Sequence, residues 1–312
     1  MIREIRPADT PRVLEFLRNY FPEEEKILGT RPEGFAEIVR RVFRWDARLV
    51  TGFLRLVGRP IFRFFVVEAD GRIVATTLLT FPPRAGYISM VAVDQGYRRR
   101  GLARMLLERA RSATAARGRP YLALDVLAAN APARALYESL GYRPLRSASY
   151  LVHDDPRAFG RGPGPVPGLR PFRREDAPAL AEIAQTSAPA EIEQVLPTSA
   201  RDIAGSAWVA RMLASESAAW VLDDGAGPVA WVAAVSSRAT EAAHVSAPII
   251  GPDVKEESAA ALVRTAGAWC GGRGAPRLAA TLPEENRRGR TALEEAGFHD
   301  VLPIWTLYRR VA

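Results

Sequence analysis

The stretch that decides the fold is Tyr87-Ile88-Ser89-Met90-Val91-Ala92-Val93-Asp94-Gln95-Gly96-Tyr97-Arg98-Arg99-Arg100-Gly101-Leu102-Ala103. Its apolar beginning predicts a strand, and its end opens an amphipathic helix over about 102–117. The first turn of a helix has unpaired N–H groups and a partly positive end, so a diphosphate can bind there if the backbone is accessible. Gly101 and Ala103 leave that approach clear, and Arg98, Arg99 and Arg100 add positive charge. The alternative is an ordinary helix start with solvated arginines.

This stretch is neither a Walker motif nor a dinucleotide fingerprint, because the glycine and lysine spacings of both are missing. The flanking patterns predict helices alternating with strands. Asp70-Gly71 is the strongest hairpin signal in the chain. The predicted strands cover 2–6, 61–68, 72–79, 87–93, 121–126 and 147–152, and the further helices cover 10–20, 32–45 and 132–140. The sheet begins antiparallel and later gains parallel strands, so the predicted fold class is α/β (α+β) with a mixed sheet.

The chain is predicted to contain two copies of one domain. Residues 156–168 are rich in proline and glycine and are interpreted as a linker. A shift of 156 places residues 98–142 over 254–298 without a gap, and twelve of the 45 positions are identical. The 312 residues are enough for two domains, so we expect domains at 1–155 and 169–312.

The two copies differ in net charge. The chain has 43 basic and 35 acidic residues, a net charge of +8. Up to Gly160 there are 27 basic and 17 acidic residues, a net +10, which leaves 16 and 18, a net −2, for the remainder. We therefore expect one half alone to bind a large anion. Nucleic acid is not the expected partner, because no zinc finger, basic zipper or RNA-binding aromatic signature accompanies the charge.

The composition argues against several other classes of protein. Cys270 is the single cysteine, so no disulfide within the chain or thiolate cluster is possible. The histidines, His153, His244 and His299, are far apart, and no metal site is expected. The charged start is unlike a signal peptide, and no apolar run is long enough to span a bilayer. We expect a cytoplasmic protein without a membrane partner.

Two motifs resemble those of the GNAT N-acyltransferase superfamily. Arg98-x-x-Gly101-x-Ala103 is similar to the family's acyl-CoA pyrophosphate loop, Gln/Arg-x-x-Gly-x-Gly/Ala. Asn130-Ala131-Pro132-Ala133-Arg134-Ala135-Leu136-Tyr137-Glu138-Ser139-Leu140-Gly141-Tyr142 resembles its second signature, Asn-x-x-Ala-x-x-Leu-Tyr-x-x-x-Gly-Phe/Tyr. The resemblance covers roughly residues 1–152 and reaches the second half through the repeat.

The resemblance implies an acetyl-CoA-dependent N-acetyltransferase that acts on a small-molecule or peptide amine. It implies that the family's tyrosine, here Tyr137, protonates the departing thiolate, and that Asn130 hydrogen-bonds the cofactor; the alternatives are a core tyrosine and a helix N-cap. By the same analogy the strand backbone contacts the pantetheine arm and the thioester carbonyl. The cofactor-binding residues implied are Met90, Val91, Ala92, Val93, Arg98, Arg99, Arg100, Gly101, Leu102, Ala103, Asn130 and Ala133.

The general base is not fixed by the sequence, and neither is the oligomeric state. Glu68 and Asp125 are candidate bases, each with a structural role as the alternative. Glu23-Glu24-Glu25 lies where the family binds its acceptor and could attract an amine; a solvated charge run is the alternative. A non-catalytic acyl-CoA-binding or regulatory protein is the second functional hypothesis, and a nucleic-acid-binding protein the third.

The second copy is expected to keep the fold and lose the site. In the 156 shift Glu256 replaces an arginine and Glu257 replaces Gly101, so two carboxylates would repel a diphosphate. Leu293 stands in the position of Tyr137. We therefore predict that this half shapes or covers the acceptor site, or forms an interface.

Overall fold

The computed structural model describes residues 1–18, 62–205, 216–237 and 242–311. The predicted helix at 32–45 and the acidic run at 23–25 lie outside these residues. The first half matches the other predicted elements closely, with the largest differences at its last strand. In chain order its elements are β1 (Ile2–Glu4), α1 (Thr10–Arg18), β2 (Phe62–Ala69), β3 (Arg72–Thr80), β4 (Ala85–Val93), α5 (Leu102–Ala115), β5 (Tyr121–Leu127), α6 (Ala131–Ser139) and β6 (Arg143–His153).

The second half repeats this order of elements. They are β7 (Leu169–Pro171), α7 (Ala177–Ser187), α8 (Ala190–Val195), β8 (Glu216–Asp223), β9 (Pro228–Ser237), β10 (Ala242–Val245), β11 (Ile249–Ile250), α10 (Glu256–Gly271), β12 (Leu278–Pro283), α11 (Arg287–Glu295) and β13 (His299–Arg310). Local signals explain the boundaries. Asp70 and Gly71 both have positive φ, which the predicted tight hairpin between β2 and β3 requires, and Asn130 and Asn286 each cap the helix that follows them.

One mixed sheet runs through the described residues in the order β1-β2-β3-β4-β5-β13-β6-β12-β10-β9-β8-β7, with β11 paired to β9. The last strands of the two halves are exchanged. Strand β13 lies between β5 and β6 and pairs antiparallel with both. Strand β6 pairs with β12 and does not pair with β5. Each half-sheet is therefore completed by a strand from the other half, an arrangement that the sequence analysis did not anticipate.

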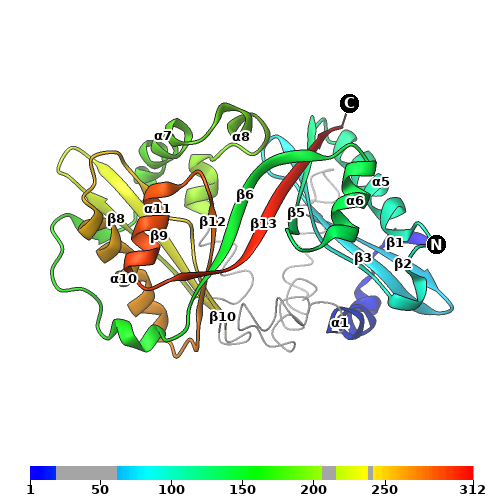
Figure 1. Cartoon of the computed structure of the whole chain (residues 1–312), viewed down its shortest axis with the longest axis horizontal. Helices are drawn as coiled ribbons and strands as arrows, with labels where there is room; N and C mark the ends of the chain where they lie inside the picture. The colour runs from blue at the N-terminus through cyan, green and yellow to red at the C-terminus, as the bar shows by residue number, and fades with distance from the viewer. Residues whose placement is uncertain (19–61, 206–215, 238–241, 312) are drawn as a thin grey trace.

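The two halves form one continuous body around this exchange. Strands β6 and β13 run side by side through the middle of the molecule, with α5 and α6 on one side and α10 and α11 on the other (Figure 1). The core under α5 includes Leu106 and Leu107, both fully buried, and the core under α10 includes Leu262. Full burial of each such side chain contributes about 2 kcal/mol of hydrophobic free energy.

The proline- and glycine-rich segment between the halves is ordered against the second half. Residues Pro156–Phe159 form a 3-10 turn, and the Phe159 ring packs on His153 with centroids 4.4 Å apart. Gly267 and Gly271 of α10 let this segment pack closely on the helix, because a Cβ on either would lie within 2.5 Å of Phe159 or Pro156. The segment thus fixes α10 in place as well as connecting the halves. No helix in the described part of the chain is long and apolar enough to cross a membrane.

Candidate active site

Strands β4 and β5 separate halfway along β4. The parallel pairing covers Ala85–Ile88 against Tyr121–Leu124 and then stops. On its other side β4 has one extra residue relative to β3, because Thr76 pairs with Ala92 while Leu78 pairs with Ser89. The bulge gives Met90 a positive φ of 57°, an uncommon backbone conformation for a side chain of this kind. Because the pairing ends there, backbone groups of Met90–Val93 on the β5 side have no strand partner among the described residues.

Threonine hydroxyl groups of β3 hold this bulge in place. Thr76 Oγ1 donates to the Met90 carbonyl at 3.2 Å, and Thr77 Oγ1 donates to the Ser89 carbonyl at 3.3 Å. Both threonines are fully buried. The sequence analysis missed these two residues; the visible signal was a pair of threonines in an otherwise apolar strand.

Arg98–Gly101 form an exposed loop that leads into α5, and Leu102 and Ala103 begin that helix. Arg99 and Gly101 have φ values of 62° and 78°, and Gly101 is the N-cap of α5 without a side-chain hydrogen bond to that helix end. A Cβ on Gly101 would meet no other atom within 4 Å. Glycine is thus favoured by backbone conformation, and the space in front of the helix N-terminus is open.

The three predicted arginines are exposed but differ in their contacts. Arg98 Nε donates to the Val93 carbonyl at 3.3 Å, which ties the loop to the end of β4. The Arg100 guanidinium lies over the Tyr97 ring, 4.9 Å from its centroid, and Tyr97 donates to Asp70 Oδ2 at 2.6 Å. Positive charge therefore surrounds the open helix end, with Arg98 and Arg100 fixed by neighbouring groups.

Asn130 acts as a helix cap and still has an amide group available. Its Oδ1 accepts from the Ala133 backbone N–H at 3.2 Å, so the alternative role considered for this residue is present. Asn130 is exposed, and its Nδ2 donates no hydrogen bond within the described residues. The cap orients the side chain and leaves an N–H donor for a ligand.

Tyr137 lies in the core of the first half, near the separated strands. It is 6% exposed, and its ring lies 5.8 Å from that of Tyr142. Burial raises the pKa of Tyr137 to about 12, because the charged phenolate loses water. The phenol therefore keeps its proton at neutral pH.

Glu68 is held in an ion cluster and is a poor candidate base. Its carboxylate accepts from Arg3 Nη2 at 2.7 Å and from Arg12 Nη2 at 2.9 Å, and Arg3 also binds the buried Asp9. Hydrogen bonds from both arginines hold the pKa of Glu68 below its usual range. The second half has the same arrangement in Arg170, Asp176 and Asp223. Because the cluster recurs in both copies, it belongs to the shared fold.

Asp125 has a different environment. It is exposed and lies one residue beyond Leu124, the last residue of β5 that pairs with β4. Its carboxylate accepts from Thr306 Oγ1 of β13 at 2.7 Å and from the hydroxyl of Tyr87. Burial, with Asp125 beside it, raises the pKa of Tyr87 well above its usual value. Of the two candidate bases, Asp125 alone lies where the strands separate.

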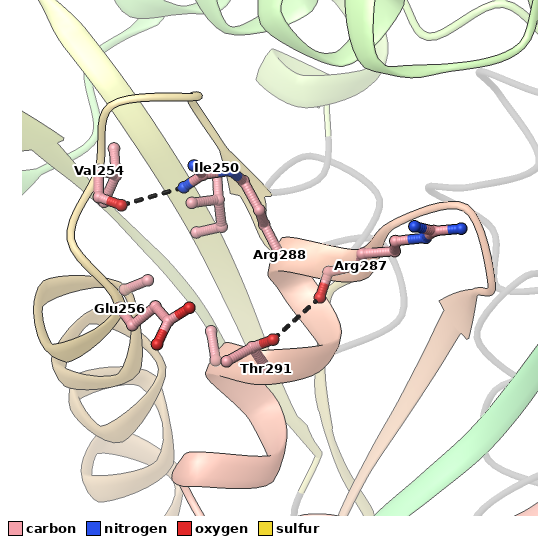
Figure 2. A pocket seen from close by; sticks show the side chains of 8 residues that line it. Ile250, Val254, Glu256, Arg287, Arg288 and Thr291 are labelled. Carbon is pink, nitrogen blue, oxygen red and sulfur yellow. Dashed lines mark hydrogen bonds between the residues drawn. The ribbon is translucent and has the colours of Figure 1, made fainter.

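The second half has a closed counterpart of the loop. A small cavity of about 160 Å³ lies at the start of α10, with Glu256 in the first helical turn. Figure 2 shows the side chains that line it. The Arg288 side chain crosses it and donates to the Val254 carbonyl at 3.0 Å and to the Pro252 carbonyl. In the 156 shift Arg288 replaces Pro132, a substitution whose effect the sequence analysis missed. Glu256 and this arginine line the cavity at the position that corresponds to the exposed helix end of the first half.

In the second half a side chain joins the end of β12 to the segment between β10 and β11. Asn286 Nδ2 donates to the Pro248 carbonyl at 2.8 Å, while Asn286 Oδ1 caps α11 through the Gly289 N–H at 2.9 Å. The corresponding Asn130 makes only the capping bond within the described residues. Pro248 has no N–H to offer a ligand in the segment between β10 and β11. The geometry of the first half therefore fits an elongated anionic ligand, and that of the second half does not.

Comparisons with known proteins concern the family and the fold. Residues 14–142 match the profile of the acetyltransferase (GNAT) family. The whole chain superimposes on a tandem GNAT protein from the clavulanic acid biosynthesis pathway, with a TM-score of 0.69 and 16% identity over 100% of this chain and 98% of that one. It also superimposes on a GCN5-related N-acetyltransferase from Sphaerobacter thermophilus, with a TM-score of 0.65 and 16% identity, over 100% and 95% of the two chains. At these identities the likeness concerns the fold.

Sequence relatives are more similar over a shorter stretch. A mycothiol acetyltransferase from Beutenbergia cavernae is 42% identical over 79 residues, which is 25% of this chain and 27% of that protein. A [ribosomal protein bS18]-alanine N-acetyltransferase from Salmonella typhimurium is 43% identical over 76 residues, 24% of this chain and 51% of the relative. The chain thus spans about a quarter and about half of the lengths of these two relatives.

Proposed function

Because residues 14–142 match the profile of the GNAT acetyltransferase family, we propose that this chain transfers an acetyl group from acetyl-CoA to a primary amine, in its first half. The observation that carries the proposal is the open helix end at Gly101 beside the separated strands β4 and β5. The closed counterpart in the second half limits the proposal to one cofactor site per chain. We place the catalytic unit in residues 1–155 and assign a supporting role to residues 169–312.

The residues of the first half fit acetyl-CoA, which supplies an activated thioester. The N–H groups at the start of α5 would hold the diphosphate, and the arginines of the loop would add charge. The unpaired edge of Met90–Val93 would receive the pantetheine arm as an additional strand. Asn130 Nδ2 would donate to the same arm.

The chemical step requires three contributions from the chain. A neutral amine attacks the thioester carbon, so a C–N bond forms and the C–S bond breaks. A backbone N–H of Met90–Val93 stabilises the negative charge on the carbonyl oxygen. Asp125 accepts the proton that the amine loses, directly or through water, and Tyr137 donates a proton to the departing thiolate. The net change moves the acetyl group from CoA to the amine and one proton from the amine to the CoA sulfur. Proton transfer through solvent then returns Asp125 and Tyr137 to their starting forms.

The test is the release of free thiol from acetyl-CoA in the presence of a panel of primary amines. We expect release to depend on the amine and the full chain to bind acetyl-CoA in a 1:1 ratio by calorimetry. Binding without amine-dependent thiol release from any amine would favour a non-catalytic acyl-CoA-binding protein. A ratio of 2:1 would contradict the loss of the second site.

A further inference from the structure

A cavity of about 590 Å³ lies along the middle of the sheet, where the two halves meet. Its walls include side chains from the four central strands β5, β13, β6 and β12, and from helix α7. Among the described residues that line it, three come from the first half, namely Asp125, Arg146 and Ala148, and the others come from the second. The cavity thus begins beside the separated strands of the first half and extends into the second half.

We propose that this cavity binds the acceptor, that the second half forms most of it, and that the acceptor is a small amine which also carries a carboxylate. The inference rests on the proposed function, because it names the substrate class of the same reaction. It also gives the second half a role that requires no cofactor there.

The first-half end of the cavity offers a fixed carboxylate. Thr306 Oγ1 and the Tyr87 hydroxyl hold Asp125 from two directions, and the side chain remains exposed toward the cavity that it lines. A protonated or neutral amine can donate to this carboxylate. Because Asp125 follows Leu124 at the separation of the strands, an amine bound there lies next to the unpaired edge of β4.

Two hydrogen-bond donors that line the cavity lack a partner within the described residues. The indole N–H of Trp231 is one, in a side chain that is 6% exposed and held edge-to-face against Phe172 at 6.4 Å. The Nε–H of Arg146 is the other, while the Nη1 of the same side chain lies 3.6 Å from Glu285. Leaving a buried donor unpaired is costly, and such groups are rare in native proteins. A carboxylate in the cavity that contacts either side chain would supply the acceptor that this donor lacks.

Size and charge narrow the ligand class. A volume of about 590 Å³ is within the range of roughly 300–1,000 Å³ typical of small-molecule sites. The wall combines carboxylates with guanidinium groups, among them Asp202 and Arg287 of the second half. A mixed wall suits a zwitterion better than a polyamine, which would meet the arginines, or an anion, which would meet the carboxylates.

The test measures binding to the full chain by calorimetry without acetyl-CoA. The probes are the free α-amino acids, their carboxamides, the amines that lack the carboxylate, and a tripeptide. We expect at least one free amino acid to bind tenfold or more tightly than its carboxamide. Trp231→Phe keeps an aromatic ring and removes the N–H. The affinity of this variant for the same amino acid should fall about fivefold to tenfold. Asp125→Asn should weaken binding at least tenfold, and both variants should bind acetyl-CoA as the wild type does.

Trp220→Phe is the matched control, because Trp220 packs on Trp269 at 6.1 Å and does not line the cavity. Equal losses in Trp231→Phe and Trp220→Phe would overturn the proposal. The proposal would also be overturned if the tripeptide alone or the simple amines alone were bound, or if no probe were bound. If the amino acid binds but acetyl-CoA does not, the proposed function fails, and the acceptor role with it. If acetyl-CoA binds and peptides alone are acetylated, the proposed function stands and the present inference fails.

Discussion

The two halves of the molecule share their framework and differ at one helix end. Both have an Arg–Asp–carboxylate cluster near their first strand, and both cap their last α-helix with an asparagine. In the first half the N-terminus of α5 is open in front of Gly101. In the second half Arg288 and Glu256 line a small cavity at the corresponding helix end (Figure 2). A binding site can thus be lost through a few side chains while the fold that supported it remains.

The largest expected effect tests the open helix end directly. Gly101→Glu should weaken acetyl-CoA binding about 1,000-fold, because a side chain at φ 78° is strained and its carboxylate faces the diphosphate. Gly101→Ala should cost only about tenfold, since a Cβ there meets no other atom within 4 Å. Calorimetry with acetyl-CoA measures both. Glu257→Gly in the second half is the matched control and should leave the affinity and the 1:1 ratio unchanged. If Glu257→Gly lost as much affinity for acetyl-CoA as Gly101→Glu, the proposed difference between the halves would be wrong.

Next in size is the effect at the proposed proton donor. Tyr137→Phe should lower kcat about 100-fold, with the KM for acetyl-CoA unchanged, because the variant keeps the packing and loses the acid. With the pKa of Tyr137 at about 12, the wild-type phenol stays protonated, so its ionisation should cause no loss of rate between pH 7 and 10. Steady-state kinetics across this range measure both. Leu293→Tyr, the counterpart in the second half, should add no activity, and a normal rate in Tyr137→Phe would rule out the assignment.

A smaller effect is expected at the feature that the halves share. Asp9→Asn and Asp176→Asn should each lower the free energy of unfolding by about 2 kcal/mol, since each removes a charge from a buried cluster. Hydrogen bonds from Arg3 and Arg170 lower the pKa of these carboxyls. Their contribution is therefore complete above about pH 4 and is lost as the pH falls through the lowered values. Urea unfolding at pH 7 and pH 2.5 measures this, and a variant that loses as much stability at pH 2.5 as at pH 7 would contradict it.

The smallest effect is expected where the second site is closed. Arg288→Ala removes a partly solvated guanidinium that donates to the Val254 and Pro252 carbonyls, so stability should change by less than about 1 kcal/mol. Glu256 and Glu257 remain in the first turn of α10, and the acetyl-CoA ratio should stay 1:1. Calorimetry with acetyl-CoA measures this ratio. A second binding event in the variant would mean that Arg288 alone prevents binding in the second half.

Local sequence determined the helices and strands, the duplication, and the replacement of the arginine and glycine loop by Glu256 and Glu257 in the second half. Asp70-Gly71 fixes a hairpin, Gly101 permits the φ that the loop adopts, and the alignment at a shift of 156 places Glu256 and Glu257 at a helix start. These features depend on residues within a few positions of one another, or on the copying of one sequence. They are therefore visible without coordinates.

Tertiary structure alone decided the exchange of strands and the cavity along it. Because β6 and β13 end two copies of one fold, either strand can complete either half-sheet, and the sequence gives no preference between the two pairings. Contacts between the halves depend on that choice, including the one that joins Thr306 to Asp125 across 181 positions of the chain. The same distinction holds for Arg288, whose side chain closes a site 34 residues away. Pairings over such separations are set by the packing of the whole sheet, which no local pattern records.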